Sequence, residues 1–394
     1  MNYYSLYNMN ILIDLIPFQY RGGIGGAASF AKAVYDRLLS ESSGKDIHIY
    51  GAYDSTLPIG KQYNYRQYAS QHNIILLDIS SDSIASLIQR EKIGVFFIAM
   101  GHFYASYDLS GITCKTIMFI HDIFDVERTD TRVDLVLHDK VAEPAWRWAK
   151  RCANLFIGRW EKMNRSLYDH IMPLYTAPTT QAYTVSDYTR NALKYYFPQI
   201  QKEIKVCYAP LKHSTPNDTI SNPELQQLVS SGKPYLLLLA ANRRYKNPKL
   251  TTHVFKRLLM DYPDLHLLTL KYGHTIHPQH IDIPFLTDSD LEHAYQQAQA
   301  LIFPSFFEGF GYPPIEAMRY GTPVIVSHVT SIPEILGDAA VYFSPFYPAD
   351  LYRAIMMVLS DRNCRKEQMK RRLAEISQRQ EDDIKKLIDD IMKQ

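Results

Sequence analysis

Short apolar runs alternate with amphipathic, helix-length segments along most of this 394-residue chain. Buried parallel strands read as continuous apolar runs, and strands that alternate with helices indicate a parallel, doubly wound sheet. The first half of the chain therefore predicts an α/β domain over residues 1–210. Its expected strands are Asn10–Ile16, His48–Ala52, Asn73–Asp78, Val95–Ala99, Lys115–Ile120, Ala182–Ser186 and Lys205–Ala209.

A second alternation of the same kind follows a polar stretch at 212–225, which is rich in Pro, Ser, Thr and Asn and reads as a linker. It predicts a second α/β domain over residues 211–374. Beyond Asn363 the chain is strongly charged, with sparse apolar residues at helical spacing, and predicts one or two surface helices. The expected strands of the second domain are Tyr235–Ala240, Leu265–Leu270, Ile283–Leu286, Ala300–Phe303 and Val324–Ser327.

Composition excludes several classes of protein. The net charge is only +2, so neither nucleic-acid nor membrane binding follows from the total charge. The four cysteines are scattered without a CxxC pair, which argues against a disulfide framework or a zinc site. The N-terminal residues do not read as a signal peptide, and no apolar run is long enough to span a membrane. We expect a cytoplasmic protein.

One segment, 139–165, has a different pattern. Its apolar residues recur at helical spacing, and basic residues, Arg165 among them, fall on the opposite face. A basic amphipathic helix can lie on a membrane surface. The alternative is an ordinary helix that packs on the core and turns a solvated basic face outward.

The stretch 303–345 organises the second domain. After the strand Ala300–Phe303, a turn carries Glu308 among aromatic residues and glycines, and Glu316 lies eight positions further on, in the first turns of a short helix. Backbone amides of such a turn can approach an anion at the start of a helix. The residues alone leave three roles open for the two carboxylates: an acid/base pair, acceptors for sugar or ribose hydroxyls, or helix capping and solvation.

A basic loop follows the strand Tyr235–Ala240 and contains Arg243, Arg244 and Lys246. Three cations at the carboxyl end of a strand suit a diphosphate, because guanidinium binds phosphate oxygens as a fork and ammonium acts as a point charge. We expect these fixed cations to act without a divalent metal ion. The alternative is a solvated basic loop without a ligand.

Two further features lie in the first domain. His121 ends the strand Lys115–Ile120, where it could bind a substrate hydroxyl or simply bond a backbone group. The segment with Gly23, Gly25 and Ala28 fits G-x-G-x-x-A between a strand and a helix, a weak dinucleotide fingerprint. The acidic residue expected after the second strand is not clear, and Asp54 lies beyond a glycine.

Two capping boxes are also expected, one at Ser289 with Glu292 and one at Ser331 with Glu334. Each would place the serine side chain at the start of a helix.

Taken together, FPSFFEGFGYPPIEAMRYGTPVIVSHVTSIPEILGDAAVYFSP, DSDLEHAYQQAQALIFPS, TVSDYTRNALKYY, RGGIGGAASF and NRRYKN closely resemble the retaining glycosyltransferases of family 4. The resemblance implies a GT-B fold, with two Rossmann-like domains that face a cleft. It implies that the acceptor binds the N-terminal domain, that the nucleotide sugar binds the C-terminal domain, and that a last helix, 375–394, completes the N-terminal one.

The resemblance also implies roles for single residues. Glu308 would contact the transferred sugar, Glu316 the ribose, and Lys246 with Arg243 or Arg244 the diphosphate. His121 would orient the sugar. Backbone amides near Gly309, Phe310 and Gly311, and near Gly23 and Gly25, would approach sugar and phosphate.

The sequence thus predicts a retaining, metal-independent glycosyltransferase of bacterial surface polysaccharide assembly. Its catalytic residues would be His121, Glu308, Arg244 and Lys246. It would need no cofactor beyond a UDP- or GDP-sugar donor, use a glycan or lipid-linked acceptor, and make peripheral contact with the inner face of the cell membrane through 139–165. Two alternatives remain: an NAD-dependent oxidoreductase that uses the Gly23–Ala28 loop, and a non-catalytic sugar-binding protein.

Overall fold

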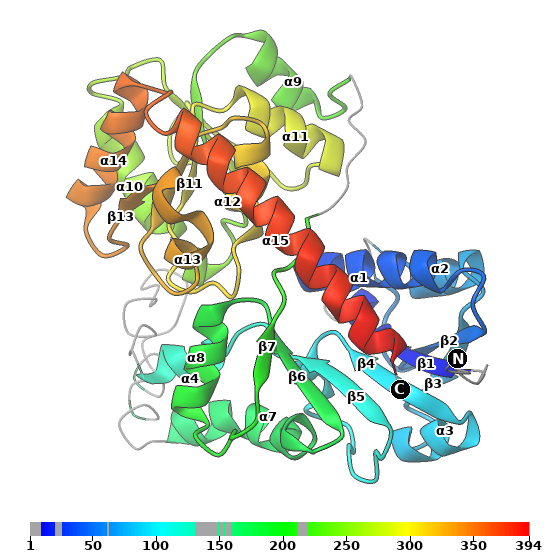
Figure 1. The fold of residues 1–394 in the computed structure, drawn as a ribbon. Coiled ribbons are helices and arrows are strands. Elements are labelled where there is room, and N and C mark those ends of the chain that lie inside the picture. Colours follow the sequence, from blue (N-terminus) through cyan, green and yellow to red (C-terminus); the bar gives the residue numbers. More distant parts are fainter. Residues whose placement is uncertain are drawn as a thin grey trace. The chain divides into compact units, whose positions relative to one another are not determined.

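The chain forms two compact units in the computed structural model (Figure 1). The structure describes residues 9–19, 26–60, 63–130, 149, 153, 159–211 and 219–393. Unit 1 comprises Met1–Asp130, Lys150–Lys212 and Arg379–Gln394. Unit 2 comprises Thr131–Ala149 and His213–Gln378.

The described strands of unit 1 form a seven-stranded parallel sheet in the order β3-β2-β1-β4-β5-β6-β7. The direction of strand addition reverses at β1 and β4, which is where open α/β sheets bind ligands, beyond the carboxyl ends of the strands. The strands are β1 (Met9–Asp14), β2 (Ile47–Tyr53), β3 (Ile75–Asp78), β4 (Ile93–Ile98), β5 (Lys115–Phe119), β6 (Thr180–Thr184) and β7 (Ile204–Val206).

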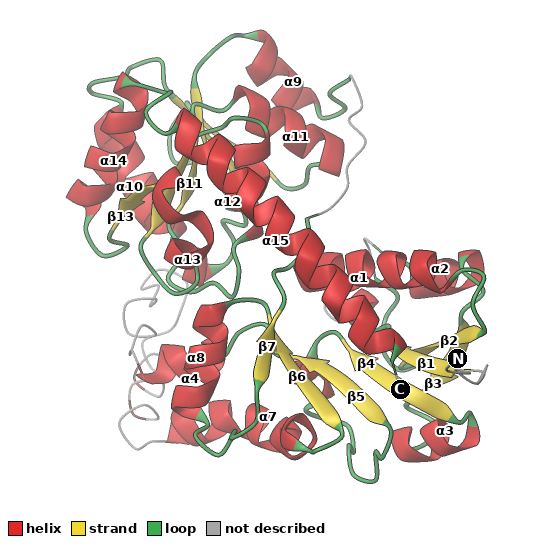
Figure 2. Cartoon of the chain, viewed as in Figure 1, coloured by secondary structure: helices red, strands yellow, loops and turns green. Residues whose placement is uncertain are grey.

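Helices cover both faces of this sheet. Figure 2 shows α1 and α2 on one side and α3 and α7 on the other. The helical segments are η1 (Ile16–Phe18), α1 (Gly26–Ser42), α2 (Tyr65–Gln71), α3 (Ile84–Arg90), η3 (Gly101–Tyr104), α4 (Phe124–Asp130), α7 (Arg159–Thr176) and α8 (Asp187–Tyr196). Side chains such as Ile171 of α7 and Leu193 of α8 join Phe96 and Ile98 of β4 in one buried cluster. Burial of this apolar surface is the main favourable contribution to folding.

The described strands of unit 2 form a six-stranded parallel sheet in the order β10-β9-β8-β11-β12-β13. They are β8 (Tyr235–Leu238), β9 (His266–Leu270), β10 (His280–Ile283), β11 (Ala300–Phe303), β12 (Val324–Ser327) and β13 (Val341–Phe343). The helical segments are α9 (Pro223–Ser230), η4 (Arg244–Lys246), α10 (Pro248–Leu258), α11 (Asp288–Gln297), α12 (Tyr312–Arg319), α13 (Ile332–Leu336), η5 (Gly337–Ala339) and α14 (Pro348–Ser360). Phe255 of α10 and Ile355 of α14 are fully buried in one cluster with Ile302 of β11.

The charged tail forms a single helix, α15 (Lys366–Met392). Its first part belongs to unit 2, where the Arg372 guanidinium donates to the carbonyls of Glu334 and Ile335. From Arg379 onward it belongs to unit 1, where the Gln380 amide donates to the carbonyl of Ala209 at 2.5 Å. Helical spacing places Ile384, Leu387 and Ile391 on one buried face, which is how a mostly charged sequence can dock.

The α/β class and the two parallel sheets confirm the prediction from the sequence. Three local predictions were wrong. The strand expected at Ile283–Leu286 is His280–Ile283. The N-cap of α11 is two residues earlier than expected, because Thr287, not Ser289, accepts the hydrogen bond from the Asp290 amide at 3.1 Å. Ser331 makes no side-chain capping bond at α13.

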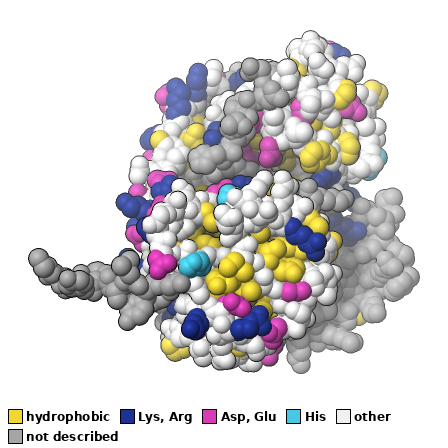
Figure 3. All heavy atoms as spheres, turned by 90° about the vertical axis from the view of Figure 1, so that its right-hand side faces the viewer, with side chains coloured by type: hydrophobic (Ala, Val, Ile, Leu, Met, Phe, Trp, Pro, Cys, Tyr) yellow, Lys and Arg dark blue, Asp and Glu magenta, His cyan; other side chains and the backbone are white. Residues whose placement is uncertain are grey.

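The molecular surface carries charges of both signs. On the face drawn in Figure 3, the described basic side chains lie interspersed with acidic ones, in keeping with the net charge of +2. Among the helices that the structure describes, none is long and apolar enough to cross a membrane.

Candidate functional site

The loop between β11 and α12 requires glycine at its last position. Gly311 has φ of 92° and is the residue before the first turn of α12. A Cβ atom there would lie 2.6 Å from Cδ1 of Ile332, so a side chain would be both strained and crowded. Pro313 and Pro314 follow in the first turn, where the missing amide costs no helical bond. The sequence thus fixes where the helix starts, and with it the position of Glu308 before it.

Glu308 and Lys246 form a buried ion pair. Lys246 comes from η4, after β8, and its ammonium contacts Oε1 of Glu308 in the neighbouring loop after β11. The side chains are only 9% and 11% exposed. The Lys246 ammonium also lies 4.5 Å from the ring centroid of Phe303, which adds a cation–π contact. A nearly dry ammonium and carboxylate therefore meet at the carboxyl ends of two adjacent strands.

The backbone of Glu308 is held on both sides. Its amide donates to Oγ1 of Thr330 at 3.0 Å, and its carbonyl accepts from Oγ of Ser331 at 2.9 Å. Thr330 has φ of 47°, a left-handed conformation that is uncommon outside glycine. Ser331 therefore fixes the Glu308 loop and does not cap α13. Sequence reasoning did not single out Thr330 and gave Ser331 a capping role instead. The signal that could have found their positioning role is their place just after β12, at the same edge of the sheet.

Glu316 is held by a neighbouring helix. Its Oε2 accepts a hydrogen bond from the Tyr295 hydroxyl of α11 at 2.9 Å. Burial, and the nearby Glu316 carboxylate, raise the pKa of Tyr295 well above its ordinary value, so the phenol stays a donor. The Tyr295 ring is stacked on Tyr320 with 6.0 Å between centroids. Sequence reasoning missed Tyr295 because an aromatic residue in a helix reads as core.

The three cations of the loop after β8 have different surroundings. Lys246 is buried, whereas Arg243 and Arg244 are exposed. The Arg243 guanidinium donates to the hydroxyl of Tyr245 at 3.0 Å. Gly309 and Phe310 lie in the same loop as Glu308, and Phe310 is buried. The structure thus brings Lys246 and Glu308 together at one edge of the unit 2 sheet, with the two arginines exposed and Glu316 on α12, the helix that follows the Glu308 loop.

His121 lies in unit 1, at the end of β5. Its Nε2 lies 2.9 Å from the carbonyl of Ala99, and its ring contacts Phe30 edge-on at 4.6 Å. Burial lowers the pKa of His121 to about 3, so the imidazole is neutral. A carbonyl can only accept, so Nε2 carries the proton and Nδ1 is left as an acceptor. His121 is therefore bonded to a backbone carbonyl, one of the two roles that the sequence left open. Its Nδ1 can still accept a hydrogen bond from a substrate hydroxyl.

Two predicted features fall largely outside the described residues. Gly23 and Gly25 lie outside them, as does most of the segment 139–165. The structure does describe Arg165, whose guanidinium donates to the carbonyl of Tyr196 at 2.6 Å and lies over the ring of Phe197. Arg165 is half-buried against the end of α8, and the membrane contact expected for 139–165 stays a prediction because most of that segment lies outside the described residues.

A buried carboxyl that the sequence did not single out ends β1, at the reversal point of the unit 1 sheet. Oδ1 of Asp14 accepts from the Tyr104 hydroxyl and from the Ile16 amide, both at 2.9 Å. Within the described part of the chain, its Oδ2 is buried without a hydrogen-bond partner. Burial raises the pKa of Asp14 to about 7.

No group of three or more His, Cys, Asp or Glu residues that could hold a metal ion is found among the described residues.

Curated relatives resemble the chain over parts of its length. It is 31% identical over 180 residues to the O-antigen chain mannosyltransferase RfbU of Salmonella typhimurium, which covers 42% of this chain and 46% of the relative. It is 39% identical over 94 residues to the O-antigen chain mannosyltransferase B of Escherichia coli, covering 24% and 25%. A serotype-specific mannosyltransferase WbdA of Escherichia coli is 30% identical over 145 residues, or 32% of this chain and 18% of WbdA. The aligned stretches span less than half of each relative.

Solved structures resemble nearly the whole chain. WaaG, a glycosyltransferase involved in lipopolysaccharide biosynthesis, has a TM-score of 0.64 at 12% identity and covers 98% of this chain and 100% of its own. The sucrose-phosphate synthase of Thermosynechococcus elongatus has a TM-score of 0.64 at 13% identity, with 96% and 97% covered. Anabaena HepE in complex with UDP and glucose has a TM-score of 0.61 at 14% identity, with 98% and 100% covered. At these identities the likeness shows the fold, and the predicted GT-B architecture is confirmed.

None of these relatives and structures supports an NAD-dependent oxidoreductase or a non-catalytic sugar-binding protein. Residues 222–380 match the family model described as glycosyl transferases group 1. Lys246, Glu308 and Glu316 all lie inside this range. Residues 222–380 therefore form a group 1 glycosyltransferase domain within a chain of GT-B fold.

Proposed function

We propose that the chain is a retaining, metal-independent mannosyltransferase that transfers mannose from a nucleoside-diphosphate mannose to a glycan or lipid-linked acceptor in O-antigen-type polysaccharide assembly. The observation that carries the proposal is the buried Lys246–Glu308 pair, inside the range that matches the glycosyltransferase family. The mannosyl group is proposed because three of the relatives above are named mannosyltransferases. We place this reaction at the cytoplasmic side of the membrane.

Each residue has a role in this proposal. Lys246 binds the diphosphate, with Arg243 or Arg244 as its surface partner, and stabilises the charge that grows on the leaving phosphate. Glu308, freed from Lys246 by the phosphate, accepts hydroxyls of the transferred sugar. Glu316 accepts ribose hydroxyls, and Tyr295 holds its carboxylate in place. His121 accepts a sugar hydroxyl through Nδ1.

The reaction balances without an added base. The bond between the anomeric carbon and the diphosphate oxygen breaks, and the acceptor hydroxyl forms its bond to the same face of that carbon. The proton of the acceptor hydroxyl passes to the leaving phosphate oxygen. Fixed cations at the diphosphate supply the stabilisation that a divalent metal supplies elsewhere.

The proposal is tested by incubating the chain with GDP-mannose, UDP-glucose and UDP-galactose, each with an α-mannose oligosaccharide, in the presence of EDTA. We expect transfer from GDP-mannose, with an α-linkage in the proton NMR spectrum of the product. Lys246→Ala should lower turnover, and Glu316→Ala should mainly raise the donor KM. Lys233→Ala, an exposed lysine of unit 2, is the matched control. A β-linked product would overturn retention, and activity abolished by EDTA and restored by Mg²⁺ would overturn metal independence.

A further inference from the structure

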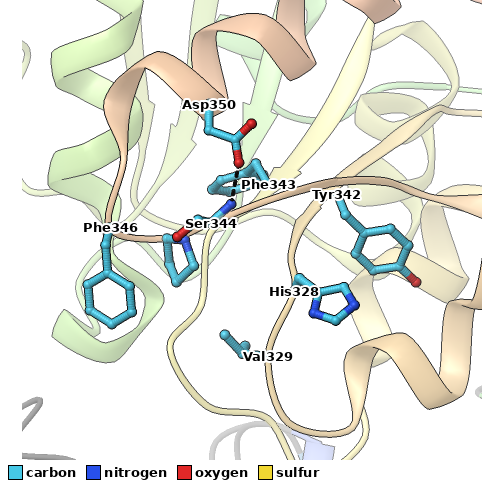
Figure 4. Close-up of a pocket in the computed structure, with 8 residues that line it drawn as sticks. His328, Val329, Tyr342, Phe343, Ser344, Phe346 and Asp350 are labelled. Atoms are coloured by element: carbon cyan, nitrogen blue, oxygen red, sulfur yellow. Dashed lines mark hydrogen bonds between the residues drawn. The ribbon is translucent and has the colours of Figure 1, made fainter.

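A shallow pocket of about 370 Å³ opens on unit 2, at the carboxyl ends of β12 and β13 (Figure 4). This volume lies within the usual range for small-molecule sites, ~300–1,000 Å³. In Figure 4, His328 and Tyr342 stand on one side of the pocket and Phe346 on the other, with Asp350 beyond Ser344. None of the residues that line it is Lys246, Glu308 or Glu316.

The aromatic walls are available to a ligand. The Phe346 side chain is 52% exposed, although its ring lies only 5.3 Å from the ring of Phe306. His328 is exposed, and its ring meets that of Tyr342 edge-on at 5.2 Å. Exposed rings on two sides of an open pocket suit a flat molecule with apolar faces.

The polar groups that line the pocket can form hydrogen bonds with the hydroxyls of a ligand. The Asp350 carboxylate accepts from the Ser344 amide at 2.7 Å and from the Arg353 guanidinium at 3.0 Å, and the Ser344 amide in particular holds the pKa of Asp350 below its ordinary value. A carboxylate has about four acceptor positions, so it can take further donors. Within the described part of the chain, neither the Ser344 hydroxyl nor the His328 imidazole makes a hydrogen bond.

The pocket shares its supporting loops with the Lys246–Glu308 pair. The Asn247 amide, next to Lys246, donates to the carbonyl of Pro345 at 3.0 Å. Thr330, next to Val329 of the pocket, holds the Glu308 amide. The pocket therefore continues the same edge of the sheet, next to the loops that carry the Lys246–Glu308 pair.

We propose that this pocket is an additional saccharide subsite, besides the acceptor site expected on the N-terminal domain, and that it binds one further pyranose ring of the acceptor glycan, with Phe346 and His328 against its faces and Asp350 and Ser344 on its hydroxyls. A pyranose ring has apolar C–H faces and a rim of hydroxyls, which matches aromatic walls with acceptor groups between them. The Asp350 carboxylate keeps free acceptor positions beside its bonds to Ser344 and Arg353, so a ligand with hydroxyl donors fits this pocket better than a purely apolar one. The inference rests on the proposed function for the identity of the glycan.

The experiment measures binding of α-mannotetraose to the full chain by saturation-transfer NMR and calorimetric titration, without donor. Phe346→Ala and His328→Ala should each weaken binding about tenfold, as expected for the loss of an aromatic face. Tyr347→Ala is the matched control, because Tyr347 is the adjacent exposed aromatic, at 66%, and does not line the pocket. Thermal unfolding of each variant confirms that the fold is kept.

The outcomes separate this inference from the proposed function. If Phe346→Ala and His328→Ala bind the oligosaccharide as the parent does, or if Tyr347→Ala weakens binding equally, the subsite is wrong. If the parent binds through this pocket but transfers no sugar from any donor, the proposed function fails and the subsite stands. If the chain transfers mannose and the acceptor KM is the same in Phe346→Ala and His328→Ala, the function stands and the subsite fails.

Discussion

The Tyr295 hydroxyl donates a hydrogen bond of 2.9 Å to Oε2 of Glu316, so a residue of α11 fixes the carboxylate of α12. Tyr295 is 2% exposed, and its ring is held by the stack on Tyr320. The carboxylate that is proposed to take the ribose is therefore oriented before any donor binds. Pre-organisation of this kind reduces the ordering cost of binding.

Replacing Tyr295 with Phe should weaken donor binding without affecting turnover to the same degree. A hydrogen bond to a charged group contributes ~1.5–3 kcal/mol, so we expect the donor KM to rise roughly tenfold or more. Tyr235→Phe is the matched control, because the buried Tyr235 hydroxyl donates to the Ala294 carbonyl at 2.7 Å and not to Glu316. Steady-state kinetics of both variants, with the donor concentration varied, give the donor KM and the turnover number. Equal donor KM values in the two variants would contradict a positioning role for Tyr295.

The Lys246–Glu308 pair should show strong coupling in unfolding experiments. Lys246→Met leaves the Glu308 carboxylate buried without its cation, which typically costs ~3–5 kcal/mol. The double variant Lys246→Met with Glu308→Gln should lower the free energy of unfolding by clearly less than the two single changes together. Each single change leaves one buried charge without its partner, whereas the double variant leaves none. Urea unfolding of the parent, both single variants and the double variant gives the coupling energy.

The exposed pair Arg257–Asp261 is the control for that cycle. Its side chains are 53% and 35% exposed, so its coupling should be below ~1 kcal/mol. If the Lys246–Glu308 coupling were as small as this, the pair would be a surface-like contact, and the picture of a dry pair opened by the diphosphate would be wrong.

The general architecture followed from the sequence because buried parallel strands are continuous apolar runs, and those of both sheets were recognisable except for β13, which was not predicted, and β10, which was misplaced. The glycine and proline pattern around Gly311 also located the start of α12. These features depend on neighbouring residues in the chain, and periodicity reports such local preferences directly.

The supporting contacts of the site did not follow from the sequence. Tyr295 reaches Glu316 across 21 positions, and Thr330 and Ser331 reach Glu308 across 22 and 23. Such partners are set by how helices and loops pack on the sheet, which no local pattern encodes. The same reason explains Ser331, whose spacing to Glu334 matches a capping box but whose hydroxyl finds a closer acceptor in the Glu308 carbonyl.

His121 should make the protein sensitive to acid. Its pKa is about 3 in the folded chain and 6.5 ordinarily, so below pH 6.5 the unfolded chain binds a proton that the folded chain does not. Its contribution to stability is present above pH 6.5 and is lost as the pH falls towards 3, with a slope of at most about 1.4 kcal/mol per pH unit. His121→Asn keeps a donor for the Ala99 carbonyl but cannot titrate, so its urea midpoint should fall less steeply between pH 6.5 and 4. His328→Asn, at an exposed imidazole, controls for the substitution itself, and a parallel slope for His121→Asn and the parent would contradict the assignment.

Asp14 should act on stability in the opposite direction. Burial raises its pKa from 3.8 to about 7, so the folded chain holds a proton between these values that the unfolded chain has released. That contribution is fully present below pH 3.8 and is lost as the pH rises through 7. Asp14→Asn keeps an oxygen to accept from Tyr104 and Ile16 but has no proton to lose. The difference in urea midpoint between Asp14→Asn and the parent should therefore become more favourable to the variant from pH 5 to pH 8.

Asp36→Asn, on an exposed carboxylate paired with Lys32 in α1, is the control for a loss of charge in the same unit. A pH-independent difference for Asp14→Asn would mean that the carboxyl at the end of β1 is ionised throughout, and that an unpartnered Oδ2 does not keep it protonated.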